Sequence, residues 1–424
     1  MSVYKHRIVD DILLRKLQGK GAVLIEGPKW CGKTTTASQI AKSSLKLGEV
    51  NTLRENRALA DIDPVLLLKG SVPRLIDEWQ TIPVIWDAVR SEVDNRNMPG
   101  QFILTGSAVP IQTDEIIHTG TGRISRLSMR TMSLVESGDS TGEIRLSSLF
   151  EIKDNIFAQC DIDIEQLAYL VCRGGWPQAV LLRHDIALDQ AIDYYDAVVN
   201  HDISRMDNVG RDPDRVKLLM RSYSRHQGAS VSYGAICNDM KSNDNSKLSD
   251  ETVAAYIKAL KRIFVIEDLP AWNPNLRSKS AIRTADTRYF SDPSVATAAL
   301  GIGPGDLIND LETFGLVFET LCVRDLRIFA EAIGGSVYHY RDSNGLECDA
   351  VIHLRNGHYG LVEIKLGGDR LIEEGAKNLL KLANIIDTTR MPEPSFMMVL
   401  IGIGKYAYRR KDGVYVVPIG CLGR

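Results

Sequence analysis

The 424-residue chain carries 51 Lys and Arg against 54 Asp and Glu, a net charge of −3, and 44% of its residues are hydrophobic. This length exceeds what one core usually covers, so we expect several domains of about 100–200 residues each. The near-neutral charge argues against a general attraction to nucleic acid, so DNA contact would need a local basic face. No apolar run approaches the ~18 residues that span a bilayer, and we expect no membrane contact.

The seven cysteines are scattered along the chain and form no CxxC pair. This spacing predicts reduced thiols rather than disulfides or a zinc site. The start of the chain, MSVYKHRIVDDILLRK, lacks the continuous apolar core of a secretion signal. We therefore expect a cytoplasmic protein.

Residues 1–140 alternate apolar runs with helical patterns, as in GAVLIEG, PRLIDEWQ and GQFILTGS. Repeated strand-helix units of this kind predict an α/β nucleotide-binding domain. Within it, GPKWCGKT fits G-x-x-x-x-G-K-[ST] and lies between apolar AVLIE and a helix-prone segment. The glycines permit a tight loop whose N–H groups bind phosphate at a helix N-terminus. The motif predicts an ATP site.

In this loop Lys33 is expected to reach the β- and γ-phosphates, and the Thr34 hydroxyl is expected to hold Mg²⁺. Trp30 and Cys31 are expected to be set by packing, because the loop binds through its backbone there. The expected nucleotide-binding residues are Gly27, Pro28, Lys29, Trp30, Cys31, Gly32, Lys33, Thr34 and Thr35.

Four polar residues after the loop are candidates for hydrolysis. Asp77 and Glu78 end a short apolar run, where Asp77 would hold Mg²⁺ and Glu78 would activate water. If Glu78 points away, ATP would be bound and hydrolysed slowly. Ser107 is a candidate sensor of the γ-phosphate, and an ordinary strand-end turn is the alternative. Arg123 is a candidate arginine finger for its own or a neighbouring subunit, and a surface arginine is the alternative.

Two middle segments follow. Residues 141–210 show helical patterns and a GGWP turn, which predict a helical lid. Residues 211–305 contain three short helical patterns and then a β-prone hairpin, which predict a winged helix. Basic residues concentrate there and favour a DNA-contacting surface, although winged helices also bind proteins. These residues are Lys258, Lys261, Arg262, Arg277, Lys279, Arg283 and Arg288.

Residues 306–424 alternate polar and apolar residues as strands do. Asp349, followed fourteen positions later by Glu363-x-Lys365, has the spacing of a D…ExK nuclease site, and Glu319 on a preceding helix adds a further oxygen ligand. Such a site would hold Mg²⁺ for phosphodiester cleavage, with Lys365 neutralising charge. A half-exposed sheet with a charged solvent face is the alternative.

The order GPKWCGKTTT, LIDEWQ, FILTGSA, GR and GGWP, followed by YFSDP, GLVFETLCVRDL and YRDSNGLECDAVI before VEIK, resembles the bacterial and archaeal AAA-type ATPases that carry an uncharacterised C-terminal domain. The resemblance runs through most of the chain. It implies an AAA-like ATPase module first and a domain similar to the restriction-endonuclease-like PD-(D/E)xK fold last. Trp30, Cys31 and Trp79 stand where smaller or aliphatic residues are usual in that family.

The predicted fold is α/β: a P-loop AAA-like domain with a helical lid, a winged-helix middle domain, and a C-terminal α/β restriction-endonuclease-like domain at residues 306–424. We expect an ATPase with ATP and Mg²⁺ as cofactors that drives conformational change and acts on DNA. The alternative is an ATP-dependent switch or scaffold for protein partners with an inactive nuclease-like domain. The expected partners are ATP, DNA, and either further copies of this chain or other proteins. A small-molecule kinase is disfavoured because nothing after the phosphate loop resembles an acceptor pocket.

Overall fold

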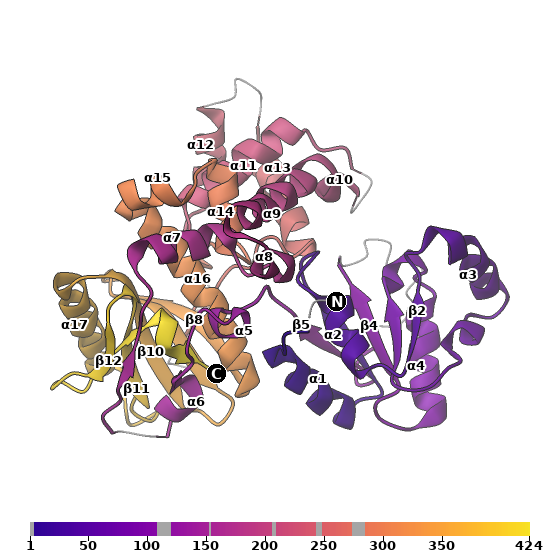
Figure 1. The fold of residues 1–424 in the computed structure, drawn as a ribbon, viewed down its shortest axis with the longest axis horizontal. Coiled ribbons are helices and arrows are strands. Elements are labelled where there is room, and N and C mark those ends of the chain that lie inside the picture. Colours follow the sequence, from indigo (N-terminus) through magenta and orange to yellow (C-terminus); the bar gives the residue numbers. More distant parts are fainter. Residues whose placement is uncertain (1–3, 108–119, 152–153, 206–208, 243–247, 274–284) are drawn as a thin grey trace.

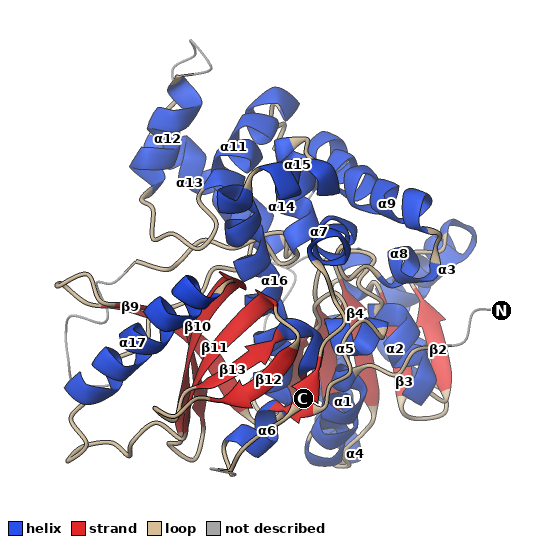
Figure 2. Ribbon diagram, turned by 60° about the vertical axis from the view of Figure 1, so that its left-hand side comes forward, coloured by secondary structure: helices blue, strands red, loops and turns tan. Residues whose placement is uncertain are grey.

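The structure is a computed structural model that describes residues 4–107, 120–151, 154–205, 209–242, 248–273 and 285–424. A five-stranded and a seven-stranded sheet lie beneath a group of helices from the middle of the chain (Figures 1 and 2). All seven cysteines are free thiols. Within the described ranges, no helix has the length and apolar character needed to cross a membrane.

The first sheet is parallel throughout, in the order β2-β3-β4-β1-β5. Its strands are β1 (Ala22–Glu26), β2 (Ser43–Lys46), β3 (Arg74–Asp77), β4 (Phe102–Gly106) and β5 (Ile124–Ser128). Strands β1 and β4 lie at its centre and are almost wholly buried, as their continuous apolar runs require. The helices of this part are α1 (Ile8–Gly19), α2 (Lys33–Ile40), α3 (Val50–Ile62) and α4 (Ile85–Arg96). The predicted α/β fold with a parallel P-loop sheet is confirmed.

Two short helices follow the first sheet, α5 (Leu134–Ser137) and α6 (Leu146–Leu149). A helical layer comes next in the chain. Its members are α7 (Ile164–Arg173), α8 (Pro177–Leu181), α9 (His184–Ala197), α10 (Ile203–Arg205), α11 (Pro213–Arg225), α12 (Tyr233–Lys241), α13 (Asp250–Arg262), α14 (Pro293–Leu300) and α15 (Pro304–Asn309). Helices α14 and α15 pack on α7, so segments expected in three different domains meet in one layer.

The second sheet is mixed, in the order β7-β12-β13-β11-β10-β9-β8. Its strands are β7 (Ala158–Gln159), β8 (Gly335–Arg341), β9 (Glu347–Leu354), β10 (Tyr359–Gly367), β11 (Phe396–Ile403), β12 (Tyr406–Arg409) and β13 (Tyr415–Pro418). Helix α16 (Leu311–Ala332) packs with one hydrophobic cluster of the sheet, and α17 (Asp369–Ile385) packs with another. Strands β10, β11 and β13 are therefore mostly buried, whereas β8 and β12 are partly exposed.

Residues 141–151 and 154–160 lie beside the second sheet, whereas the sequence patterns placed them in the lid. Strand β6 (Ile144–Arg145) pairs with β14 (Leu422–Gly423), and β7 pairs with β12. These strands are two residues long, too short to show the alternation by which a strand is recognised. Their partners come from the far end of the sequence, which no local pattern could indicate.

Candidate functional site

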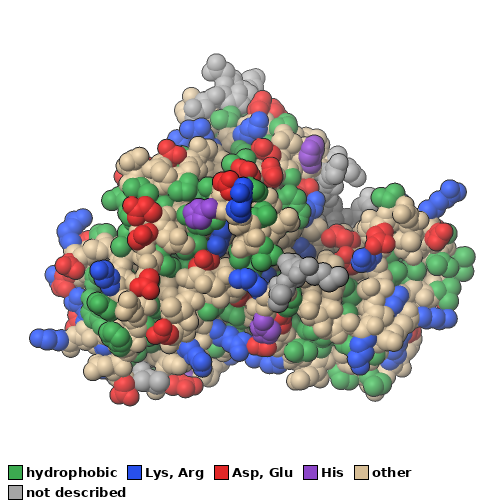
Figure 3. Space-filling view, in the orientation of Figure 1, with side chains coloured by type: hydrophobic (Ala, Val, Ile, Leu, Met, Phe, Trp, Pro, Cys, Tyr) green, Lys and Arg blue, Asp and Glu red, His purple; other side chains and the backbone are tan. Residues whose placement is uncertain are grey.

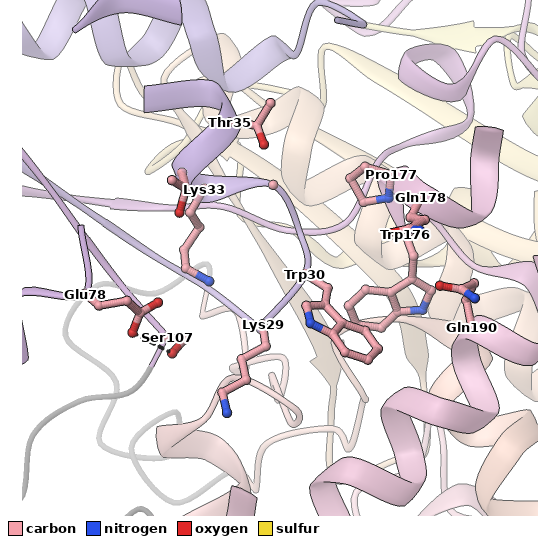
Figure 4. A pocket seen from close by; sticks show the side chains of 12 residues that line it. Lys29, Trp30, Lys33, Thr35, Glu78, Ser107, Trp176, Pro177, Gln178 and Gln190 are labelled. Carbon is pink, nitrogen blue, oxygen red and sulfur yellow. Dashed lines mark hydrogen bonds between the residues drawn. The ribbon is translucent and has the colours of Figure 1, made fainter. Parts of the chain in front are cut away.

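A cavity of about 620 Å³ opens at the carboxyl ends of β1, β3 and β4, and residues of helices α8 and α9 also line it. Figure 4 shows the lining side chains. The phosphate loop follows β1, Glu78 follows β3 and Ser107 follows β4, so the parallel sheet brings all three to one edge. The lining residues are Lys29, Trp30, Gly32, Lys33, Thr34, Thr35, Glu78, Ser107, Trp176, Pro177, Gln178 and Gln190.

The phosphate loop is shaped by its glycines and by Lys33. A Cβ at Gly27 would lie 2.0 Å from the Met129 carbonyl oxygen, so a side chain does not fit there. Gly32 has φ of 102°, a left-handed conformation that favours glycine, and it caps the N-terminus of α2. The buried Lys33 Nζ donates to the carbonyl oxygens of Gly27 (2.9 Å) and Pro28 (2.7 Å). Within the described part of the chain no carboxylate bonds this ammonium group, so its charge remains available to an anion.

Thr34 and Asp77 meet beside the loop. The Thr34 hydroxyl donates to Asp77 Oδ1 at 2.7 Å, and the Thr105 hydroxyl donates to the same oxygen. A hydroxyl and a carboxylate are the oxygen ligands that Mg²⁺ accepts, and this ion keeps several waters when it binds a nucleotide. The donor set therefore fits a magnesium ion held between Thr34, Asp77 and phosphate oxygens.

Glu78 lines the cavity with φ of 55°. Its carboxylate accepts a hydrogen bond from the Gln80 amide, and the Ser107 hydroxyl lies 3.4 Å from Glu78 Oε2. The described chain has four non-glycine residues with positive φ, and two of them, Trp30 and Glu78, line this cavity. Strained backbone of this kind clusters where function fixes a side-chain direction.

Arg123 does not join these residues. It lies just before β5, at the amino edge of the sheet, and its Nε donates to Asp94 Oδ1 at 2.8 Å. The cavity lies at the carboxyl edge, about 15 Å away along a five-residue strand. The structure therefore does not support the expected arginine-finger role within one subunit. The sequence pattern did not show that Arg123 precedes a strand rather than follows one.

A buried arginine near the N-terminus bonds the backbone of the phosphate loop. Arg7 Nη1 donates to the Cys31 carbonyl oxygen at 3.0 Å, and its Nε donates to Glu136 Oε1 at 3.1 Å. Arg7 is 3% exposed. Sequence reasoning missed it because a single arginine before a helix carries no motif.

From Glu136 a chain of buried polar contacts continues to the C-terminal domain. The Leu134 N–H, in the turn that Glu136 caps, donates to Asp325 Oδ2 at 2.9 Å. Arg324 forms ion pairs with Asp325 at 2.8 Å and with Asp292 at 3.0 Å. Asp292 also accepts from the Gly175 N–H at 3.0 Å. The phosphate loop is thus linked through side chains to α16 and to the GGWP turn.

Burial alone would raise the pKa of Asp292, but Arg324 and hydrogen bonds from Ser294, Thr131 and Gly175 hold it below the ordinary value. This carboxylate therefore stays charged in the middle of the molecule. It joins three segments that are distant in the sequence, so a shift of one segment strains its contacts with the others.

A second polar cluster forms in the C-terminal domain from the four residues of the expected nuclease site. Lys365 Nζ lies 3.2 Å from Asp349 Oδ2 and 2.7 Å from Glu363 Oε2. Asp349 also accepts from the Ile364 N–H, and Glu319 on α16 completes the cluster. Glu363 is 3% exposed, so the charged face of β10 is buried rather than solvated.

This cluster is closed by the middle domain. Tyr289 donates a hydrogen bond to Glu319, and a Cβ at Gly228 would lie 2.8 Å from the Glu319 carboxylate. The space left is about 20 Å³, room for roughly one water molecule. Burial and Asp349 raise the pKa of Glu319 to about 8, so its carboxyl group is mostly protonated at neutral pH.

The cluster does not fit a divalent metal as it stands. The oxygens of Asp349 and Glu363 are engaged by Lys365, and Glu319 is engaged by Tyr289. Within the described residues, no group of three or more His, Cys, Asp and Glu side chains is arranged to hold a metal ion. The D…ExK spacing brought the right residues together but could not show this closure.

Some basic residues of the middle domain form ion pairs within the protein. Lys261 and Arg288 form ion pairs with Asp268 at 2.7 and 2.6 Å. Arg277, Lys279 and Arg283 lie outside the described residues. On the face in Figure 3, basic and acidic side chains are interspersed over the described surface.

Comparison with known proteins supports the prediction that the first domain is an AAA-type ATPase domain. Residues 19–137 match the model of the AAA domain, and with the phosphate loop above they form an AAA-type P-loop ATPase domain. Residues 164–306 match a domain of unknown function (DUF8612), and residues 314–422 match another (DUF4143). The latter two matches carry no stated activity.

Curated relatives and solved structures are distant. The chain is 23% identical over 357 residues to the uncharacterized proteins Rv2008c of Mycobacterium tuberculosis and Mb2031c of Mycobacterium bovis, covering 83% of this chain and 72% of each relative. A Walker-type ATPase of Pyrococcus abyssi has 13% identity and a TM-score of 0.42, over 68% of this chain and 94% of that one. A signal-transduction (STAND) ATPase of Pyrococcus horikoshii with a tetratricopeptide repeat sensor has 14% identity and a TM-score of 0.27, over 78% and 50%. The AAA-domain match carries the assignment.

Proposed function

We propose that this protein binds ATP with Mg²⁺ and hydrolyses it to change the arrangement of its domains. The observation that carries the proposal is the meeting of Lys33, the Thr34–Asp77 pair and Glu78 at one cavity in a domain that matches the AAA model. This set supplies a cation for the phosphates, oxygens for Mg²⁺ and a carboxylate for water.

Each residue has a distinct role in the proposed reaction. Lys33 and the loop N–H groups hold the β- and γ-phosphates, and Thr34 with Asp77 would hold Mg²⁺, which when bound compensates phosphate charge. Glu78 orients the attacking water and accepts its proton, and Ser107 positions the Glu78 carboxylate. Arg123 is proposed to act only on the nucleotide of a neighbouring subunit, if the protein assembles.

We propose that nucleotide binding changes the position of other elements through the contacts that begin at the phosphate loop. A shift of the Cys31 carbonyl on nucleotide binding would be felt by Arg7, then by Glu136 and the Asp325–Arg324 pair on α16. Packed elements with buried ion pairs tend to move as units. We propose that the receiving element is α16, which carries Glu319 of the closed cluster.

For the C-terminal domain we propose the alternative role, that of a nuclease-like scaffold without cleavage activity. The order α16-β8-β9-β10-α17-β11 supports a restriction-endonuclease-like fold as a proposal. The engaged and enclosed carboxylates do not support metal-dependent cleavage. We therefore assign no cleavage step, and we propose a switch that presents surfaces to protein partners.

DNA is retained as a second candidate partner because of the middle domain. Helices α11, α12 and α13 precede antiparallel bridges at Ile266–Phe290 and Leu269–Thr287, which supports a winged helix as a proposal. Lys258 on α13 is exposed. Stimulation of ATP hydrolysis by duplex DNA, lost at high salt, would favour this candidate over a protein partner.

The test is the steady-state rate of ATP hydrolysis of wild type and Glu78→Gln, each with and without DNA. Loss of the carboxylate should lower the rate by about 10²- to 10⁴-fold while ATP binding remains. Glu55→Gln, an exposed glutamate of the same domain, is the matched control and should hydrolyse ATP like wild type. Equal rates for Glu78→Gln and wild type would remove Glu78 from the mechanism.

A further inference from the structure

The cavity is larger than three phosphates require, and its two ends differ in chemistry. Lys33, Glu78 and Ser107 lie at one side of Figure 4, and the lid residues Trp176 and Gln190 lie at the other. Trp30 lies between them. If phosphates occupy the first end, the remainder of a nucleotide must occupy the second.

Trp30 presents an indole ring to this second end. It is 56% exposed although tryptophan is large and apolar, and its backbone φ is 65°. Its ring centroid lies 6.0 Å from that of Tyr194, which in turn lies 4.2 Å from that of the buried Trp176. Trp176 Nε1 donates to Ser294 Oγ, which fixes the wall behind. An exposed aromatic ring on a fixed aromatic wall is a stacking surface for a planar group.

Two glutamines supply polar contacts at the same end. Gln178 on α8 and Gln190 on α9 both line the cavity, and their side-chain amides bond no other group within the described part of the chain. A side-chain amide pairs with the N6 amino group and N7 of adenine by one acceptor and one donor. The N1–H and N2 amino group of guanine are best met by a carboxylate. Among the described residues, Glu78 is the one carboxylate that lines the cavity, and it lies at the phosphate end.

We propose that Trp30 stacks on the base of the bound nucleotide and that Gln190, with Gln178, recognises the edge of adenine. The inference rests on the proposed function, because it concerns the same nucleotide site. It gives Trp30 a binding role in place of the packing role expected from the sequence. It also makes the lid a part of the site, so that base binding draws α8 and α9 toward the phosphate loop.

The test is direct binding of ATP, GTP and inorganic tripolyphosphate, each with Mg²⁺, to wild type and to variants by isothermal titration calorimetry. Wild type should bind ATP more tightly than GTP or tripolyphosphate. Trp30→Ala should weaken ATP binding by about 10-fold and leave tripolyphosphate binding unchanged, and Trp30→Phe should retain most of the ATP affinity. Gln190→Ala should narrow the preference for ATP over GTP by about 10-fold.

Gln166→Ala, an exposed glutamine on α7, is the control and should bind all three ligands like wild type. If wild type binds neither nucleotides nor tripolyphosphate, the proposed function itself fails. If wild type binds ATP and tripolyphosphate equally, or if Trp30→Ala keeps the wild-type affinity for ATP, the base site is excluded and the nucleotide function stands. Because Trp30 is exposed, its replacement should not prevent folding.

Discussion

Both β-sheets bring carboxylates and a lysine to one place, but the two groups meet solvent differently. In the ATPase domain they surround a cavity of about 620 Å³, whereas in the C-terminal domain they enclose about 20 Å³. Lys33 bonds backbone carbonyl oxygens, while Lys365 lies between two carboxylates. The first lysine keeps its charge for an incoming anion, and the charge of the second is already balanced.

The difference shows that matching residue types are not enough to define a working site. A cation that is to bind phosphate must lie where folding has not already satisfied it. Carboxylates that are to hold a metal must keep free oxygen atoms and an entry path. The ATP cavity meets the first condition, and the C-terminal cluster meets neither part of the second. Removing one member of each group at a time tests this difference.

The largest expected effect separates the two lysines. Lys365→Met should lower the free energy of unfolding by about 3 kcal/mol, because it leaves the carboxylates of Asp349 and Glu363 together without a cation. Lys33→Met should change it by about 1 kcal/mol or less, since only hydrogen bonds to carbonyl oxygens are lost. Urea unfolding of both variants measures the contrast.

Lys33→Met should at the same time abolish ATP binding. Loss of binding in a variant of nearly wild-type stability would show that the Lys33 side chain is needed for function rather than for folding. Equal destabilisation by the two variants would break the comparison. It would mean either that the C-terminal carboxylates tolerate loss of their cation or that the phosphate loop depends on Lys33 for its fold.

The pH dependence of stability sharpens the same contrast. Burial and Asp349 raise the pKa of Glu319 to about 8, whereas a glutamate in an unfolded chain titrates at about 4.3. Between these values the folded state holds a proton that the unfolded state has lost. The contribution of Glu319 to stability therefore falls as pH rises through this window, by at most about 1.4 kcal/mol per pH unit, and levels off above the raised pKa. Burial and Asp349 also raise the pKa of Glu363 to about 7, which adds to the same fall.

Urea unfolding of wild type and Glu319→Gln from about pH 5 to about pH 8 measures this slope. The glutamine cannot titrate and can still accept from Tyr289, so its stability should fall less steeply. Glu312→Gln, an exposed glutamate at the start of the same helix, should keep the wild-type slope. Parallel slopes for wild type and Glu319→Gln would show that Glu319 is already ionised in the folded protein.

Much of the fold could be predicted from the sequence because its elements are long and strongly patterned. The apolar runs of β1 and β4, and the alternation in β9 and β10, indicate strands at the positions where the structure has them. The pairing of β6 and β7 with the end of the chain could not be predicted, since two-residue strands carry no period.

The two sites differ in how many of their residues could be predicted from the sequence. The phosphate loop is a contiguous motif, and strand order alone then brings Asp77 and Glu78 beside it. Gln190 comes from α9, a distant helix with no motif of its own, so only the folded chain shows that it lines the cavity. The closure of the acidic cluster by Tyr289 was hidden for the same reason.

The smallest expected effect concerns that closure. Tyr289→Phe removes the hydroxyl that donates to Glu319 and leaves a buried carboxyl group with one partner fewer, which should cost about 1 kcal/mol or somewhat more in unfolding free energy. Tyr338→Phe, on strand β8 of the same sheet, is the control and should change stability little. A loss in Tyr289→Phe no larger than in the control would mean that the hydroxyl does not satisfy this carboxyl group. The cluster would then be open to exchange with solvent, and it would belong with the ATP cavity as a site able to receive a ligand.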